Sequence, residues 1–293
     1  MIKKLTIEND LYGLTERPVP AEPSPEFGEA LKHLEASLPE KVRKLMGERI
    51  IGIYLVDHLG STGFTDAVMD ENQKETYAYI VLDKGVLLRR TANEWATWKE
   101  NSVFKPQPET GVTLNVVMES PQEDTVSGAI RLILMHEIGH VLGMASGIHS
   151  SWNKPAVVSD SYPFTLISWK MDKEKVVSRY DERFPDRRFV RFYAFQSALL
   201  TIGQADSIYR VLHSATDYPS LQASVDIWED FAESFATYVH VVQEGRPYEI
   251  RFQKEGEGTT VYRSCWKDDR CERKRQFLKK WFEDPASPQL KEM

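Results

Sequence analysis

The pattern of apolar and polar positions predicts strands in the first half of the chain. Ile50 to Val56 is a nearly continuous run of strand-forming residues, typical of a buried strand. Residues 76–82 and 86–88 have the same character. Residues 112–119 place apolar side chains on one face and a mixed set on the other, which is the period of a strand near a sheet edge. We therefore expect a sheet with 112–119 as its edge strand.

The remaining pattern predicts loops and helices. Loops at 60–63 and 70–72 separate the first two strands. Ser24-Pro25-Glu26 offers an N-cap with proline at the first helical position, and apolar residues then recur at helical spacing, so a pair of helices precedes the first strand. Further helices are expected at 121–145, 194–213, 225–243 and 272–283.

The order of these elements predicts the fold class. Strands first and helices later indicate an α+β chain with two lobes. Residues 1–24 contain few large apolar side chains and end in a cluster of prolines, so we expect a tail or linker there. An N-terminal α/β lobe with a mixed sheet should span 25–146, and a mainly helical lobe should span 147–293.

Composition excludes several classes of protein. The chain has 293 residues, 41% of them hydrophobic, and a formal net charge of −7. That balance predicts no nucleic-acid partner, because such surfaces are basic. No apolar run approaches the roughly 18 residues of a membrane-spanning helix. The content of apolar and aromatic residues excludes a disordered chain.

The two cysteines and the N-terminus bear on location. Cys265 and Cys271 are too few for a disulfide scaffold, and their spacing allows either a small-loop disulfide or two separate thiols. The first residues lack the apolar segment of a signal peptide, which favours the cytoplasm. The proline-rich tail and the close cysteine pair favour an exported mature form, and of the two we expect export.

An HExxH motif at 136–140 carries the chemistry. A capping box at 120–123, with proline at the first helical position, predicts a buried helix that contains it. His136 and His140 are then four residues apart on one face, about 6 Å along the axis, which suits two ligands of one Zn²⁺. Glu137 can reach a water bound to that metal. Buried histidines and a glutamate on an apolar helix need such a partner.

The third zinc ligand has two alternatives. One is His149, although the metzincin pattern would place the third histidine at Ser146. The other lies in the predicted helix 225–243, where Glu229 and Glu233 share one face among apolar neighbours and need a cation or donors. We favour Glu229 as the ligand, with Glu233 accepting a hydrogen bond from a ligand histidine.

At these residues the chain resembles the gluzincin metallopeptidases. Their HExxH helix is completed by a glutamate from a downstream helix, and residues 229–235, Glu-Asp-Phe-Ala-Glu-Ser-Phe, are similar to the glutamate helix of lethal-factor-like peptidases. The resemblance covers about forty residues. It implies a two-lobed zincin-like fold, one catalytic Zn²⁺ held by His136, His140 and Glu229, and Glu233 behind the metal.

The resemblance also implies a mechanism. Glu137 would act as general base on a water activated by zinc, which attacks a peptide carbonyl. Gluzincins commonly place a Tyr or His before the glutamate helix to stabilise the oxyanion; Tyr218 and His213 lie there, and we favour Tyr218. The edge strand 112–119 would hold an extended substrate. We expect His240 to be a core or surface histidine without a ligand role.

The predicted function is therefore that of a zinc-dependent peptidase with a peptide or protein substrate. One alternative is a non-catalytic binding or regulatory protein that keeps a zincin fold and a structural zinc. The presence of Glu137 favours the enzyme, since a structural site does not require it. Another alternative is a metallohydrolase of a non-peptide substrate, because the same hydroxide could attack an ester.

Overall fold

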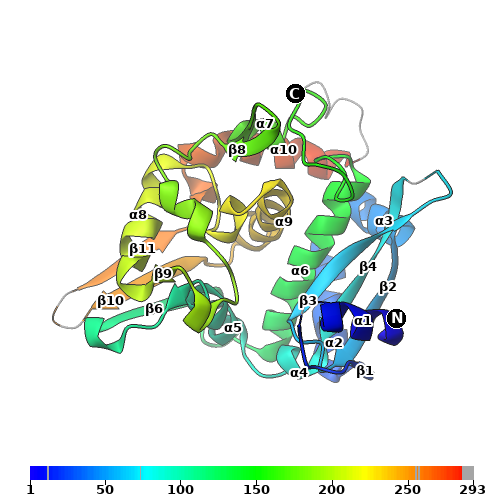
Figure 1. The fold of residues 1–293 in the computed structure, drawn as a ribbon, viewed down its shortest axis with the longest axis horizontal. Helices are drawn as coiled ribbons and strands as arrows, with labels where there is room; N and C mark the ends of the chain where they lie inside the picture. Colours follow the sequence, from blue (N-terminus) through cyan, green and yellow to red (C-terminus); the bar gives the residue numbers. More distant parts are fainter. Residues whose placement is uncertain (12, 73, 255, 257, 286–293) are drawn as a thin grey trace.

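The computed structural model describes residues 1–285 except 12, 73, 255 and 257, and it combines helices with a mixed sheet (Figure 1). This confirms the predicted α+β class. Along the chain the helices and strands are α1 (Ile2–Leu11), β1 (Val19–Pro20), α2 (Pro25–Ser37), α3 (Glu40–Arg49), β2 (Ile50–Asp57), β3 (Gly63–Met69), β4 (Glu75–Asp83), α4 (Lys84–Leu87), α5 (Ala92–Asn101), β5 (Phe104–Lys105), β6 (Val112–Val117), α6 (Val126–Ala145), α7 (Thr165–Ser168), β7 (Trp169–Asp172), β8 (Lys175–Ser178), β9 (Leu200–Thr201), α8 (Ala205–Ala215), α9 (Ile227–Tyr238), β10 (Glu249–Lys254), β11 (Thr259–Arg263) and α10 (Glu272–Glu283).

The main sheet has four strands in the order β1-β2-β4-β3. It is mixed, because β4 pairs parallel with β2 and antiparallel with β3. Alternate residues of β4 point to opposite faces: Ala78, Ile80 and Leu82 join the main core, whereas Tyr79 and Val81 belong to a second cluster. The sheet therefore has two apolar faces, and both need cover.

Helix α1 covers the second face of this sheet. Leu5 is buried in that cluster, and the side chain of Asn9 donates to the carbonyl of Leu59. Strand β1 then pairs with β2 at the edge of the sheet. The interpretation of residues 1–24 as a tail or linker was therefore wrong, because α1 packs on the second apolar face of β4 and β1 joins the sheet.

Helix α6 lies between the main sheet on one side and α9 on the other (Figure 1). It begins five residues later than predicted. Thr125 is the N-cap, and its hydroxyl accepts a hydrogen bond from the backbone N–H of Gly128 at 3.0 Å. The side chains of Ser120 and Glu123 bond to each other instead of capping a helix. Residues 120–123 thus form a turn that leads into the helix.

A second sheet joins the two predicted lobes. Its order is β11-β10-β6, and β6 pairs antiparallel with β10 over Val112–Val117. The expectation that 112–119 forms an edge strand is confirmed, but the strand lies at the edge of this sheet. Since β6 precedes residue 146 and β10 follows it, the predicted border between lobes is crossed by backbone hydrogen bonds.

Several local predictions differ from the structure. Residues 86–88 were expected to be a strand, but the Asp83 carboxylate accepts from Val86 N–H and starts the short helix α4. The expected helix 194–213 is confirmed only in its second half, as α8; before it lie two short 3-10 helices and strand β9. The loops predicted at 60–63 and 70–72 flank a strand, β3, that the pattern did not predict. The helices at 225–243 and 272–283 are confirmed by α9, with its π-helical extension to Gln243, and by α10.

Two further features concern the cysteines and the membrane. Cys265 and Cys271 form a disulfide, which decides between the two readings of their spacing. Among the residues that the structure describes, no helix has the length and apolar character to cross a bilayer.

Candidate metal centre

The histidines of the HExxH motif project from the middle of α6 toward α9. His136 and His140 are one turn apart, and their Nε2 atoms lie 3.1 Å from each other. Their rings are nearly perpendicular, at 87°. Because the rest of α6 is buried in apolar contacts, the backbone that carries both imidazoles is held firmly. The pair therefore presents two nitrogens at one point of the molecule.

Helix α9 brings a carboxylate to the same point. Asp226 caps this helix, and its Oδ1 accepts from the backbone N–H groups of Trp228 and Glu229, both at 2.9 Å. From that first turn, Glu229 Oε2 lies 3.5 Å from His136 Nε2, and Oε1 lies 3.7 Å from His140 Nε2. The prediction that these three residues come together is borne out by the geometry.

The spacing of the three donors fits a tetrahedral cation. Metal–ligand bonds of about 2.0–2.1 Å at the tetrahedral angle put neighbouring ligand atoms about 3.3 Å apart. The two histidine nitrogens are 3.1 Å apart, close to that value, and each lies 3.5 to 3.7 Å from its nearer Glu229 oxygen. With one ligand atom taken from each residue, all three atoms lie within 4.8 Å of one another, so a small movement of the Glu229 side chain would complete the set. Two imidazoles and one carboxylate form a donor set that Zn²⁺ accepts, with a fourth position left for water or substrate. These residues could hold zinc.

Glu233 lies directly behind His136. Its Oε1 accepts from His136 Nδ1 at 2.8 Å and from Lys99 Nζ at 3.0 Å, and its Oε2 accepts from Ser220 Oγ at 2.5 Å. With Nδ1 engaged, His136 must present Nε2 toward the metal position, as in the carboxylate–histidine–metal arrangement. This is the contact that we predicted for Glu233.

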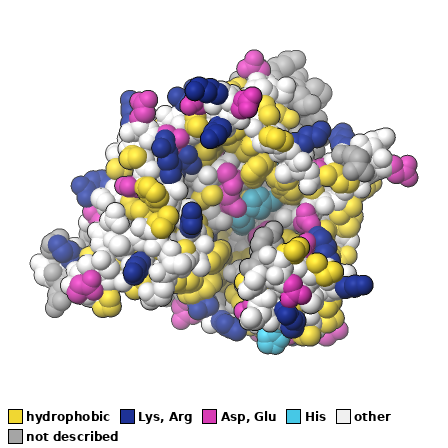
Figure 2. Space-filling view, viewed as in Figure 1, with side chains coloured by type: hydrophobic (Ala, Val, Ile, Leu, Met, Phe, Trp, Pro, Cys, Tyr) yellow, Lys and Arg dark blue, Asp and Glu magenta, His cyan; other side chains and the backbone are white. Residues whose placement is uncertain are grey.

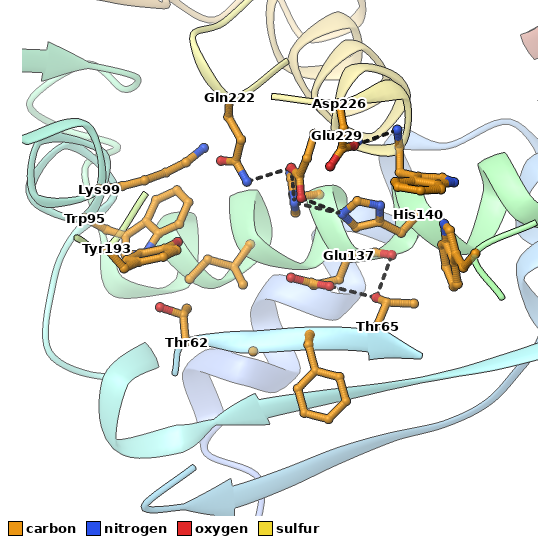
Figure 3. Close-up of a pocket in the computed structure, with 16 residues that line it drawn as sticks. Thr62, Thr65, Trp95, Lys99, Glu137, His140, Tyr193, Gln222, Asp226 and Glu229 are labelled. Atoms are coloured by element: carbon orange, nitrogen blue, oxygen red, sulfur yellow. Dashed lines mark hydrogen bonds and ion pairs between the residues drawn. The ribbon is translucent and has the colours of Figure 1, made fainter. Parts of the chain in front are cut away.

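Glu137 faces the opposite wall of the site, on β3. Thr65 Oγ1 donates to Glu137 Oε2 at 2.7 Å, and it also contacts the backbone carbonyl of Glu137 at 3.1 Å (Figure 3). Burial raises the pKa of Glu137, although the charge of His136 and the bond from Thr65 oppose that rise. A carboxylate in this position can take up a proton at a higher pH than an exposed one.

The pKa values of the ligand side chains reflect a local excess of carboxylates. Burial alone would lower the pKa of His136, but Glu229 and Glu233 outweigh it and raise the value to about 9. Burial and the neighbouring His136 hold the pKa of His140 well below its ordinary value. Burial raises the pKa of Glu229 to about 7. The carboxylates therefore favour a positive charge among them, whether a proton or a metal ion carries it.

These residues line a cavity of about 400 Å³. In the space-filling view it appears as a hollow with histidine and acidic side chains at its floor (Figure 2). Toward the N-terminal end of α6 its walls are Ile133, Trp95, Lys99, Thr62 and Tyr193. Trp152, whose ring contacts that of His140, and Trp228 line it toward the C-terminal end of α6. The cavity is therefore aromatic at both ends, with His136, His140 and Glu229 between them.

The predicted oxyanion residues do not reach this cavity. Tyr218 is fully buried, its hydroxyl pairs with Ser178 at 2.7 Å, and its ring packs between Trp169 and Tyr180. His213 lies at the end of α8 against Tyr262. The preference for Tyr218 was therefore wrong, because the residue satisfies its hydroxyl inside the core behind α9.

The two other histidines considered in the sequence are accounted for. His149 is buried beside Gly143 and stacks on Trp152, and it does not belong to the group of converging ligand atoms. His240 is buried, and its Nε2 contacts the carbonyl oxygens of Met118 and Pro247. It is a core histidine, as expected.

Most of the residues that line the cavity were not assigned to the site from the sequence. Strand β3, with Gly63, Phe64 and Thr65, forms one side of the cavity, whereas the predicted substrate strand β6 does not line it. Tyr193 also lines the cavity, and it lies in an irregular loop. Its own φ is positive, at 60°. A left-handed residue in an irregular loop leaves no periodic signal, so no pattern in the sequence could have found it.

No known protein family, no curated protein and no solved structure matches this chain.

Proposed function

We propose that this chain is a zinc-dependent peptidase with a zincin-like, two-lobed architecture of the gluzincin type. The observation that supports it best is the convergence of His136, His140 and Glu229 beside Glu137. A structural metal site needs ligands alone, but here a further carboxylate faces the same cavity, and among the described residues Thr65 is its one side-chain hydrogen-bond partner. That arrangement suits proton transfer at the metal.

Each carboxylate has its own task in this proposal. Zn²⁺ bound to the triad would lower the pKa of a coordinated water toward 7 and polarise the scissile carbonyl. Glu137 accepts the proton of the attacking water on Oε1, while the hydroxyl of Thr65 holds Oε2. Glu137 then delivers that proton to the nitrogen of the leaving amine. Glu233 keeps His136 oriented throughout, and its own charge is shared with Lys99.

Tyr193 is the residue that we assign to the developing oxyanion, in place of Tyr218. Its side chain points into the cavity (Figure 3), and its backbone N–H donates to Ser102 Oγ at 2.7 Å, which fixes the loop. Burial raises the pKa of Tyr193 to about 12. The phenol is therefore protonated at neutral pH and can donate a hydrogen bond to a charge that forms on the substrate oxygen.

Strand β3 is the element that we assign to substrate binding. It pairs only with β4, so its other edge is free of strand partners among the described residues. This edge strand carries Thr65 beside Glu137. An extended peptide added along it would pass its carbonyl groups over the metal position, by the strand addition that many peptide-binding proteins use.

Metal analysis and peptide cleavage together test the proposal. We expect one zinc per chain and hydrolysis of an unbiased peptide library that a chelator abolishes. Glu137→Gln should keep the zinc and lose hydrolysis, since the amide cannot accept the proton. Absence of zinc from the purified protein would refute the metal centre, and full activity in the Glu137 variant would remove that residue as the base.

A further inference from the structure

The cavity end toward Ile133 contains a buried cation that the proposed reaction does not use. Lys99, on α5, is only 7% exposed and lines this end. Its ammonium also lies 5.4 Å from the ring centroids of Trp95 and Phe192. Among the described residues, Glu233 is the only hydrogen-bond partner of Nζ. An ammonium has three N–H donors, so two are open to a ligand that enters the cavity.

The lone partner of Lys99 is itself shared. Glu233 Oε1 accepts from both Lys99 and His136, and Oε2 accepts from Ser220. One carboxylate charge thus serves three neighbours, Lys99, His136 and Ser220. Glu100 also attracts the ammonium, but its carboxylate accepts from the hydroxyl of Tyr209 and forms no hydrogen bond with Nζ among the described residues. The remaining N–H donors of Lys99 are therefore available to a further anion.

A second donor at the same end lacks a partner. Thr62, the residue directly before β3, is 9% exposed, and its Oγ1 lies near Tyr193 without a hydrogen bond of good geometry to any described residue. Buried hydroxyls without partners are uncommon in native proteins. Thr62 and Lys99 line the same cavity end and approach it from different elements, so a ligand between them would receive donors from two sides (Figure 3).

One acceptor at this end points to a competing ligand. Gln222 Nε2 donates to Glu229 Oε2 at 2.7 Å, but its Oε1 has no hydrogen-bond partner in the described part of the chain. A primary amide could bond to that oxygen. The donors nevertheless outnumber the acceptor, and one of them carries a full charge, so an anion satisfies more of the site than an amide does.

We propose that this end of the cavity is a carboxylate-binding subsite that selects a glutamate side chain next to the scissile bond. Trp95 and Ile133 provide an apolar wall for the two methylene groups, and Lys99 and Thr62 bind the carboxylate. The assignment of this subsite to a peptide side chain rests on the proposed peptidase function. The binding of a carboxylate to Lys99 and Thr62 does not.

Matched peptides test the selectivity. Peptides of one sequence carry either Glu or Gln at each position flanking the cleaved bond, and the ratio of kcat/KM for Glu over Gln is measured. We expect a ratio of about ten or more at one position, because a hydrogen bond to a charged group is stronger than one to a neutral group. A ratio of one or less would overturn the proposal.

Two variants separate recognition from the structural role of Lys99. Lys99→Met should bring the ratio of kcat/KM close to one. The ratio is the readout because Glu233 loses a partner in this variant, which can slow the cleavage of both peptides. Thr62→Val keeps the Lys99–Glu233 pair and should lower the ratio by about threefold, the effect of one neutral hydrogen bond. An unchanged ratio in the Lys99 variant would show that this residue is a counterion only.

A binding experiment stands apart from catalysis. Glutarate should raise the Tm of metal-free wild-type protein in a dose-dependent way, and glutaramide, its neutral diamide, should not. The Lys99→Met protein should not respond to glutarate. If no peptide is cleaved but glutarate binds in this manner, the peptidase proposal fails and the subsite stands. Equal responses to both compounds, or to glutarate in both proteins, would refute the subsite.

Discussion

Replacing Gly139 by alanine tests whether the metal centre depends on close contact between α6 and α9. Gly139 lies between the two histidines of α6, and Ala232 lies between Glu229 and Glu233 of α9. A Cβ at residue 139 would lie 2.8 Å from Ala232 Cα and 3.0 Å from its carbonyl oxygen. Both are backbone atoms, so no side-chain rotation relieves the overlap.

The size of the effect follows from this overlap. Ordinary carbon contacts are 3.5–4.0 Å, so the helices must separate by about 1 Å. Metal–ligand distances tolerate a change of about 0.2 Å. Moving Glu229 about 1 Å away from the histidines should therefore weaken zinc binding about ten- to a hundredfold. Alanine favours a helix over glycine by about 1 kcal/mol, but overpacking costs about 1–3 kcal/mol. The Gly139→Ala protein should therefore be less stable by about 1 kcal/mol.

Zinc competition titrations and thermal unfolding measure the two effects. The matched control is Gly28→Ala in α2, where an added Cβ meets nothing within 4 Å. The control should bind zinc normally and unfold at a slightly higher temperature. If Gly139→Ala behaves like the control, with normal zinc affinity and a raised Tm, the helix contact does not determine the ligand geometry and this reasoning is refuted.

Three further predictions concern single residues. Glu229→Ala should weaken zinc binding far more than His149→Ala in a chelator titration, and the reverse order would make His149 the third ligand. Tyr193→Phe should lower kcat with unchanged zinc content, whereas Tyr218→Phe should affect thermal stability and leave the chemistry intact. Burial, assisted by the nearby charge of Arg131, lowers the pKa of His240 from 6.5 to about 3. As the pH falls, the unfolded chain therefore takes up this proton before the folded chain does. The free energy of unfolding should decrease below pH 6.5, by about 3 kcal/mol at pH 4. His240→Gln should flatten that part of the unfolding profile, and identical profiles would contradict the assignment.

The convergence of His136, His140 and Glu229 could be predicted because its signal is local: polar side chains on largely apolar helices. His136 and His140 stand on a helix that is otherwise apolar, and Glu229 and Glu233 stand on another. Polar groups in such surroundings require partners, and two helices with unmatched groups of opposite character can satisfy each other. In the structure His136 lies 2.8 Å from Glu233 and 3.5 Å from Glu229, and His140 lies 3.7 Å from Glu229. No conclusion about the rest of the chain was needed for that prediction.

The strand that borders the site could not be predicted in this way. Alternation identifies a strand with one exposed face, but it does not say which sheet the strand joins. Val112–Val117 follows the rule and pairs with β10, which comes more than 130 residues later. Strand β3, by contrast, is partly exposed along its whole length and has no clean alternation. Its place beside Glu137 depends on its pairing with β4 and on the packing of α6 against both.

Tyrosines illustrate a further limit. A tyrosine is stable both in a core, where one hydroxyl partner suffices, and at a cavity wall, so its residue type does not decide between the two. Tyr218 finds Ser178 in the core, and the proline-containing turn beside it made it look like a loop residue. Tyr193 reaches the cavity only because its backbone is left-handed and its N–H is held by Ser102. Charged groups that must be paired when buried can be assigned from sequence, whereas amphipathic ones can be assigned only from the path of the backbone.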